Sequence, residues 1–333
     1  MTHAASKAVE TPAPSAAAAP AAPYLSSSPS RWTLSLPRGR SLELAAGRPR
    51  VMGVLNLTPD SFSDGGRWFD PADASRAVER GIAMLAEGAE LLDLGAESTR
   101  PGGGVYGGGA RLVPAEEELA RLLPVLEGLR AATDAPLSVD TRKAAVARAA
   151  LAAGADLVND VSALGDPEMG AVVAAAGCPV VLMHSRGELA TMQREIRFRD
   201  VVAEVRAELA EAVARAEAAG IARGQLLIDP GLGFGKTVEQ NLALLAGLPE
   251  LTGVAAIGPA LGLPVLVGAS RKSFLGAVAG PPGEPAPPER RLPGSLAAAA
   301  RAAAGGAAVL RVHDVAETAS FLRAWTAIGE ARG

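Results

Sequence analysis

"PLSVDTRKAAVARAALAAGADLVND", residues 136–160, joins two short and mostly apolar runs through a longer segment of helical character. Strands that are apolar over most of their length are typical of parallel sheets, which are buried on both faces. The segment between the runs is rich in alanine and ends in Gly154, the residue type expected just after a helix. The stretch therefore predicts a strand, a helix and a second, parallel strand.

The same alternation continues from Val51 to the end of the chain. Eight βα units in a chain of 333 residues fit a TIM barrel better than an open doubly wound sheet, which usually has about six strands. The sequence therefore predicts an α/β fold, a single (β/α)8 TIM barrel over residues 31–330. The expected strands are residues 51–57, 90–95, 136–140, 156–160, 179–184, 225–229, 264–270 and 308–314.

Two segments precede the barrel. Residues 1–30 are rich in Ala, Pro and Ser and lack the apolar region of a signal peptide, so they are expected to form a disordered tail. Residues 31–47 alternate around Pro37 to Gly39, which predicts a short β-hairpin.

Composition excludes several classes of function. The net charge of −4, without a block of Lys or Arg, gives no electrostatic footprint for nucleic acid. The long uncharged stretch of residues 252–270 is interrupted by four glycines and two prolines, so no membrane span is expected. Cys178 is the single cysteine, which rules out a disulfide framework or a thiolate metal site within one chain. The expected location is the cytoplasm.

The stretch "DPGLGFGKT", residues 229–237, resembles a phosphate-binding loop that is one residue short. Three residues separate Gly231 from Gly235, whereas the Walker A loop needs four for its N–H groups to surround a phosphate. A glycine-rich turn from strand to helix is the better interpretation. Lys236 and Thr237 would then begin the helix, with a structural role.

Polar residues end nearly every predicted strand. In a TIM barrel these strand ends form the active face, although any one of them, such as Asp140, could instead be a helix N-cap. The carboxylates and carboxamides among them suit a flat heterocycle with amino and ring N–H groups. Lys272, Arg311 and His313 suit an anionic leaving group, and the alternative for Lys272 is a solvated loop charge. The residues at the strand ends are Asn56, Asp93, Asp140, Asn159, Asp160, His184, Asp229, Ser270, Arg311 and His313.

Two long segments follow the first two strands. Residues 56–70 and 97–114 are expected to be mobile lids over the barrel mouth, with a disordered insertion as the alternative for the polyglycine part of the second. No G-x-S-x-G elbow and no zinc-ligand spacing occurs. A covalent nucleophile is therefore not expected.

Six longer motifs follow one another along the chain. They are "VMGVLNLTPDSFSDGG" (51–66), "LDLGAESTRPGG" (92–103), "SVDTRKAAVARAALAAGADLVNDVSA" (138–163), "DPGLGFGKTVEQNLALL" (229–245), "PVLVGASRKSFLG" (264–276) and "RLPGSLAAAARAAAGGAAVLRVHDV" (291–315). In their order and spacing, the chain resembles the dihydropteroate synthases of the folate pathway. The resemblance implies a TIM barrel that joins 6-hydroxymethyl-7,8-dihydropterin diphosphate to 4-aminobenzoate, with release of diphosphate, and it implies a homodimer. It also implies a largely dissociative displacement with ordered binding, the diphosphate ester first.

The resemblance also assigns roles to residues of this chain. The pterin would be held by Asp140, Asn159, Met183, Asp229, Lys272 and Arg311. The diphosphate would be bound by Asn56, Thr99, Arg311 and His313, with Mg²⁺ beside Asn56. The 4-aminobenzoate would contact Phe62, Thr99, Arg100, Pro101, Phe234, Ser270 and Lys272. Catalysis would rest on charge stabilisation by Asp140, Lys272, Arg311 and His313.

Two departures and two alternatives accompany the resemblance. Ser185 stands where the family usually has a second methionine, and the segment 97–114 is longer and richer in glycine than usual. A methyltetrahydrofolate–corrinoid methyltransferase would share the pterin-binding residues but would not need "ESTRPG" or "SRKS". A non-catalytic pterin-binding paralogue is the other alternative.

Overall fold

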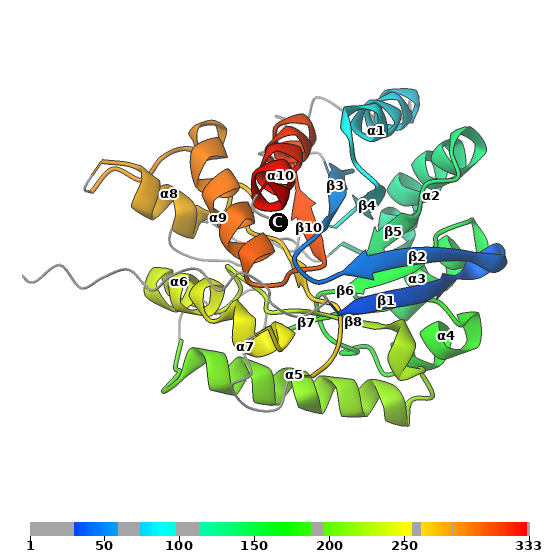
Figure 1. Ribbon diagram of the computed structural model, residues 1–333. Coiled ribbons are helices and arrows are strands. Elements are labelled where there is room, and N and C mark those ends of the chain that lie inside the picture. Colours follow the sequence, from blue (N-terminus) through cyan, green and yellow to red (C-terminus); the bar gives the residue numbers. More distant parts are fainter. Residues whose placement is uncertain are drawn as a thin grey trace, which may run out of the picture.

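Eight parallel strands form a barrel at the centre of the molecule (Figure 1). Their hydrogen-bonded order is β8-β7-β6-β5-β4-β3-β10-β9, and a bridge between Ile228 and Val265 joins the two ends. This confirms the predicted TIM barrel. The computed structural model describes residues 30–58, 74–97, 113–187, 196–254, 261–281 and 283–331. The strands are β3 (Arg50–Asn56), β4 (Leu91–Gly95), β5 (Leu137–Asp140), β6 (Leu157–Asp160), β7 (Val180–Met183), β8 (Leu226–Asp229), β9 (Leu266–Val267) and β10 (Val309–Val312).

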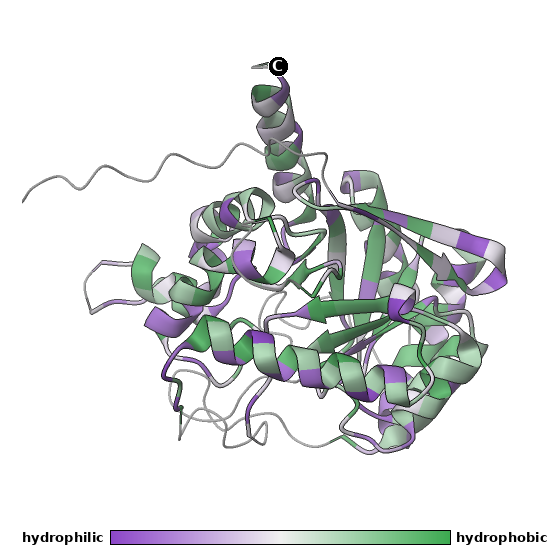
Figure 2. Cartoon of the chain, turned by 60° about the horizontal axis from the view of Figure 1, so that its bottom comes forward, coloured by the Kyte–Doolittle hydropathy of each residue, from purple (hydrophilic) through white to green (hydrophobic). Residues whose placement is uncertain are grey.

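The helices surround the barrel (Figure 1). Each turns one apolar stripe inward, as the long helix α5 at the front of Figure 2 illustrates by its alternating green and purple residues. Its residues Val201, Val205 and Leu209 recur at helical spacing and are buried. The helices are α1 (Ser75–Glu87), α2 (Ala115–Ala132), α3 (Ala144–Ala152), α4 (Met169–Ala176), α5 (Val201–Ala218), α6 (Val238–Ala246), α7 (Leu248–Thr252), α8 (Ser273–Ala279), α9 (Leu292–Ala304) and α10 (Val315–Glu330).

The predicted hairpin covers one end of the barrel. β1 (Arg31–Leu36) pairs with β2 (Arg40–Ala45) in antiparallel register around the turn Pro37–Gly39. The four leucines of the hairpin are buried in one cluster with side chains from the barrel strands. Because these barrel residues come from the first half of each strand, the hairpin closes the N-terminal end. The cluster comprises Leu34, Leu36, Leu42, Leu44, Met52, Leu91, Leu157, Val181, Leu227, Leu266, Ala308 and Val309.

A buried carboxylate fastens the hairpin to the barrel. Asp156 is fully buried and accepts hydrogen bonds from Arg38 (2.5 Å) and Arg40. Arg130 Nη2, at 2.8 Å, and the Leu137 backbone N–H, at 2.9 Å, also donate to it. A buried charge is tolerated only when it is paired and hydrogen-bonded. The buried charge of Asp156 therefore depends on the hairpin arginines, and the position of these arginines depends on Asp156.

The strand predicted over residues 264–270 is shorter than expected. Only Leu266–Val267 is strand, because the chain turns where the Lys272 N–H donates to the Ala269 carbonyl at 3.2 Å. Among the described residues, no helix is long and apolar enough to cross a membrane. The predicted tail, residues 1–30, lies outside the described residues except for Ser30.

Candidate active site at the carboxyl ends of the strands

A polar layer lies directly above the apolar layer inside the barrel. Side chains alternate between the two faces of a strand, so residues two apart share a face. Leu91, Leu227 and Val309 belong to the interior cluster, which places Asp93, Asp229 and Arg311 in the interior one layer higher. The expected gathering of polar strand ends is therefore present at this layer.

Arg311 is the centre of the polar layer. Its Nε donates to Asp93 Oδ2 at 2.5 Å, and its Nη2 donates to Asp140 Oδ2 at 2.8 Å. Asp93 Oδ2 also accepts from Asn159 Nδ2 at 3.0 Å. Four strand ends, those of β4, β5, β6 and β10, are thus joined by one network.

Asp93 is a residue whose role the sequence analysis missed. It appeared there as a polar strand end without a function, yet it is fully buried and orients both Arg311 and Asn159. Its position two residues after Leu91, in an otherwise apolar strand, was the available signal. A carboxylate at such a place must have buried partners.

Two carboxylate oxygens in this layer have open acceptor positions. Within the described ranges, Asp93 Oδ1 and Asp140 Oδ1 are buried and have no hydrogen-bond partner. Buried polar atoms are almost always paired, so an orphan of this kind calls for an explanation such as a ligand that donates to it. Asp140 Oδ1 therefore offers an acceptor for a ligand N–H group.

Burial changes the ionisation of the site. It raises the pKa of Asp140 to about 7, although the Arg311 guanidinium opposes the rise. Burial also raises the pKa of Asp229, with Lys272 as the chief opposing charge. The pKa of Lys272 is lowered to about 8 for the same reason, and Asp229 opposes that change. Perturbed carboxylates and a perturbed amine in one layer are typical of a functional site.

Lys272 is held against the loop that follows β8, rather than free in solvent. Its Nζ donates to the Leu232 carbonyl and lies 4.7 Å from the centre of the Phe234 ring. The preceding Arg271 adopts a left-handed conformation, at φ 58°, and donates through Nε to Asp314 at 3.0 Å. The alternative of a solvated loop charge is therefore wrong for Lys272.

Ser270 and His313 form the adjoining part of the rim. The His313 N–H donates to Ser270 Oγ at 3.2 Å, and His313 Nδ1 lies 3.2 Å from the same oxygen. Next to them, Asn56 ends β3, the strand that pairs with β10. A Cβ placed on Gly95 would lie 3.6 Å from Asp140 Cβ and 3.9 Å from Asn56 Oδ1, so these two side chains flank Gly95.

Two strand-end residues do not face this layer. Asp160 accepts from Ser162 and from the Leu164 backbone N–H at 2.7 Å, and so caps a turn. The His184 ring bonds to Glu208 on α5 and to Lys236. Each follows an inward-facing residue, Asn159 or Met183, so the alternation of the strand turns it outward.

The remaining predicted residues divide into two groups. Met183 is buried at the end of β7, in register with Asp229 on β8. Phe62, Thr99, Arg100 and Pro101 lie outside the described residues. Their assignment to the diphosphate and aminobenzoate sites stays a prediction.

The chain is similar in sequence and structure to known proteins. Residues 52–313 match the family described as pterin binding enzyme. The dihydropteroate synthase of Mycobacterium leprae (strain TN) is 49% identical over 286 residues, which cover 84% of this chain and 94% of that protein. The Xanthomonas albilineans dihydropteroate synthase solved with 4-aminobenzoic acid shares 48% identity, with a TM-score of 0.75 over 89% of this chain and 98% of that one. The same organism's enzyme in complex with 7,8-dihydropteroate shares 45% identity, with a TM-score of 0.72 over the same proportions of the two chains, 89% and 98%. The likeness thus extends over the whole barrel.

Proposed function

The chain belongs to the pterin binding enzymes and, within them, to the dihydropteroate synthases, and we propose from this how its barrel performs that reaction. The enzyme condenses 6-hydroxymethyl-7,8-dihydropterin diphosphate with 4-aminobenzoate, and the products are 7,8-dihydropteroate and diphosphate. A bond forms between the amine nitrogen and the pterin methylene carbon, the bond from that carbon to the diphosphate oxygen breaks, and the amine loses one proton.

The orphaned oxygen of Asp140 is the observation that carries the proposal for the pterin site. Asp140 Oδ1 is buried and unpaired among the described residues, whereas Oδ2 is held by Arg311. A pterin ring presents N–H and amino donors along its edge, and a carboxylate fixed in this way can accept from them. Asp229 and Asn159 would supply further contacts, with Met183 against the ring.

Electrostatic stabilisation of the leaving group would supply most of the rate enhancement. An aromatic amine is neutral at pH 7, so it needs no strong base, and the barrier lies in the departure of diphosphate. Arg311 and His313 would stabilise the negative charge on that group. The Asp140 carboxylate would stabilise the positive charge that develops on the pterin. Two carboxylates already fix the guanidinium of Arg311, so it need not reorganise during the reaction.

The rim would bind 4-aminobenzoate. Lys272 and Ser270 offer hydrogen bonds and positive charge for its carboxylate, and Phe234 offers an aromatic face beside Lys272. Phe62, Thr99, Arg100 and Pro101 would complete this part of the site.

Mg²⁺ is proposed to enter with the diphosphate. No group of three or more His, Cys, Asp or Glu residues among the described ones could hold a metal ion. The donor at the diphosphate end is the Asn56 carboxamide, which fits an ion bound mainly through substrate phosphates and water, as Mg²⁺ commonly is. When bound there, the ion would neutralise charge on the leaving diphosphate. Asn56 would orient it.

Two further properties belong to the same proposal. We propose that the enzyme acts in the cytoplasm and assembles as a homodimer. Light scattering on the purified full chain would test the assembly, and a mass of one chain at working concentrations would contradict it.

The reaction itself can be tested directly. The purified protein is incubated with the pterin diphosphate, 4-aminobenzoate and Mg²⁺, and diphosphate and dihydropteroate are measured together. Equal amounts of both products are expected. Tight pterin binding without either product would support a non-catalytic pterin-binding protein instead. Arg311→Met, which should turn over far more slowly, is the control, with circular dichroism to check that it is folded.

A further inference from the structure

Lys236 is a buried amine beside the active-site loop that no step of the proposed reaction uses. Only 3% of its surface is exposed. Its Nζ donates to the Gly231 carbonyl at 2.9 Å and to the Phe234 carbonyl at 3.0 Å, and it lies 3.0 Å from His184 Nδ1. A lysine ammonium has three N–H donors, and three acceptors surround this one.

The His184 ring is oriented from the other side. Its Nε2 lies 3.0 Å from Glu208 Oε2, so a neutral ring would carry its proton on Nε2 and leave Nδ1 to accept from Lys236. Burial and the nearby Lys236 lower the pKa of His184 to about 4, which keeps the ring neutral at pH 7. Glu208 is in turn held by Arg186, whose Nε donates to its two oxygens at 2.9 and 3.1 Å.

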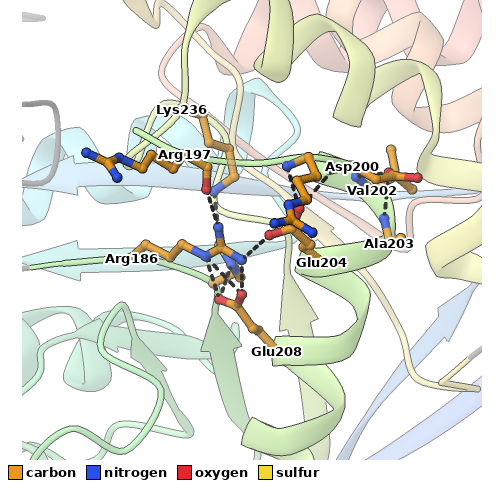
Figure 3. A network of polar contacts seen from close by, with 10 residues as sticks. Arg186, Arg197, Asp200, Val202, Ala203, Glu204, Glu208 and Lys236 are labelled. Carbon is orange, nitrogen blue, oxygen red and sulfur yellow. Dashed lines mark hydrogen bonds and ion pairs between the residues drawn. The ribbon is translucent and has the colours of Figure 1, made fainter. Parts of the chain in front are cut away.

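Figure 3 shows this support as a continuous group of side chains. Arg186 points at the carboxylates of Glu204 and Glu208 on α5, and Lys236 reaches the same region from the loop after β8. Asp200 begins α5 by accepting from two backbone N–H groups. The network therefore connects the first turns of α5 with the loop.

The loop held by Lys236 has an unusual backbone. Gly231, Gly233 and Gly235 all have positive φ, at 66°, 83° and 58°. A Cβ on Gly231 would lie 1.8 Å from the His184 carbonyl oxygen, so the loop packs directly on the end of β7. Such a glycine-rich segment has high conformational entropy when unrestrained. Lys236 restrains it by binding two of its carbonyls at once.

The opposite face of the same loop contacts the active site. The Gly231 N–H donates to Asp229 Oδ1 at 2.7 Å. The Leu232 carbonyl accepts from Lys272, and the Phe234 ring lies beneath the Lys272 amine. The loop thus lies between two lysines: Lys272 on the side of the barrel mouth and Lys236 on the side of the fold interior.

We propose that Lys236, oriented by His184 and Glu208, is a positioning residue that fixes the loop 230–236 so that Phe234 and the Leu232 carbonyl hold Lys272 for 4-aminobenzoate. It touches no substrate itself. The inference rests on the proposed function, because it assigns the Lys272 side of the site to 4-aminobenzoate.

Lys236→Met tests the inference, since it keeps an unbranched side chain, one heavy atom shorter, and removes the donors. The KM for 4-aminobenzoate is expected to rise on the order of tenfold to a hundredfold, because a small misplacement of a positioning group is costly. Binding of the pterin diphosphate, measured by calorimetry, should change much less. Thr237→Ala is the matched control: it removes the capping box of α6 without touching the loop carbonyls, and should lower thermal stability while leaving that KM unchanged.

Two variants of His184 extend the test if Lys236→Met folds poorly. In His184→Asn the side-chain oxygen can still accept from Lys236, so the KM for 4-aminobenzoate should stay near that of the wild type. His184→Leu removes the acceptor and should raise the KM for 4-aminobenzoate. In the double variant with Lys236→Met, the KM should be little higher than in Lys236→Met alone, because the effects of residues in one network are not additive. An unchanged KM in both Lys236→Met and His184→Leu would overturn the inference, whereas an inactive wild type would contradict the proposed function.

Discussion

Arg311 on β10 and Asp140 on β5 are bonded across the barrel interior at 2.8 Å, although strands β3 and β4 lie between theirs in the sheet. The contact uses one carboxylate oxygen and leaves Asp140 Oδ1 without a partner among the described residues. The cation thus holds the carboxylate in place and leaves an acceptor for the ligand.

Replacement of Arg311 should affect the chemical step most. Arg311→Met is expected to lower kcat by about 10²- to 10³-fold, the usual cost of a lost electrostatic donor. Arg311→Lys keeps the charge but lacks the planar fork that bonds Asp93 through Nε and Asp140 through Nη2, so it should recover only part of the rate. Steady-state kinetics with both substrates would measure this. A full recovery in Arg311→Lys would show that the bridging geometry is unimportant.

Pterin binding should depend on pH through Asp140. Burial raises its pKa to about 7, so in the free protein the carboxyl is largely protonated below that pH and ionised above it. Protonation places a hydrogen on the carboxyl group, whereas the ionised form keeps Oδ1 as an acceptor for a ring N–H group, so the affinity should increase as the pH rises through about 7. Calorimetry with the pterin lacking its diphosphate avoids titration of the phosphates. Asp140→Asn should abolish the increase, and a persistent increase in that variant would assign it to another group.

The buried Asp156 should contribute to stability and not to catalysis. Asp156→Asn weakens the bonds to Arg38, Arg40 and Arg130 and should lower the free energy of unfolding by about 1.5 to 3 kcal/mol, the usual range for hydrogen bonds to a charged group. Denaturant unfolding would measure this, and kcat should be that of the wild type. Arg48→Gln is the control, because its ion pair with Glu330 is exposed and should contribute little.

Alanine substitutions at Gly231 and Gly177 should distinguish the cost of backbone strain from the cost of a steric clash. Both have positive φ, at 66° and 60°, so alanine at either position costs about 1 to 2 kcal/mol of left-handed strain. At Gly177 the new methyl group meets nothing within 4 Å, whereas at Gly231 it would lie 1.8 Å from the His184 carbonyl oxygen. Gly231→Ala should therefore be the more destabilising by thermal unfolding and should alone impair turnover. Equal losses in the two variants would contradict the close packing of the loop on β7.

The sequence predicted the barrel and its polar layer well, because both follow from local patterns. Apolar strands that end in polar residues identified Asp140, Asp229 and Arg311 as neighbours without any knowledge of their contacts. The same pattern also indicated Asp160 and His184, although the alternation of the strand turns both outward, after the inward-facing Asn159 and Met183. The side chains that orient Lys236 are distant in sequence: His184 follows β7, and Glu208, which bonds to His184, lies on α5. No local pattern could reveal them.

The hairpin closes the N-terminal end of the barrel below the polar layer. Its leucines and the strand residues that they contact fill the interior from below, up to the layer of Asp93 and Arg311. Among the described residues, the route to that layer that remains is from the carboxyl ends of the strands. A molecule that binds at this layer is therefore expected to enter before the molecule that binds at the rim. Closure of one end of the barrel thus predicts the order of binding at the other.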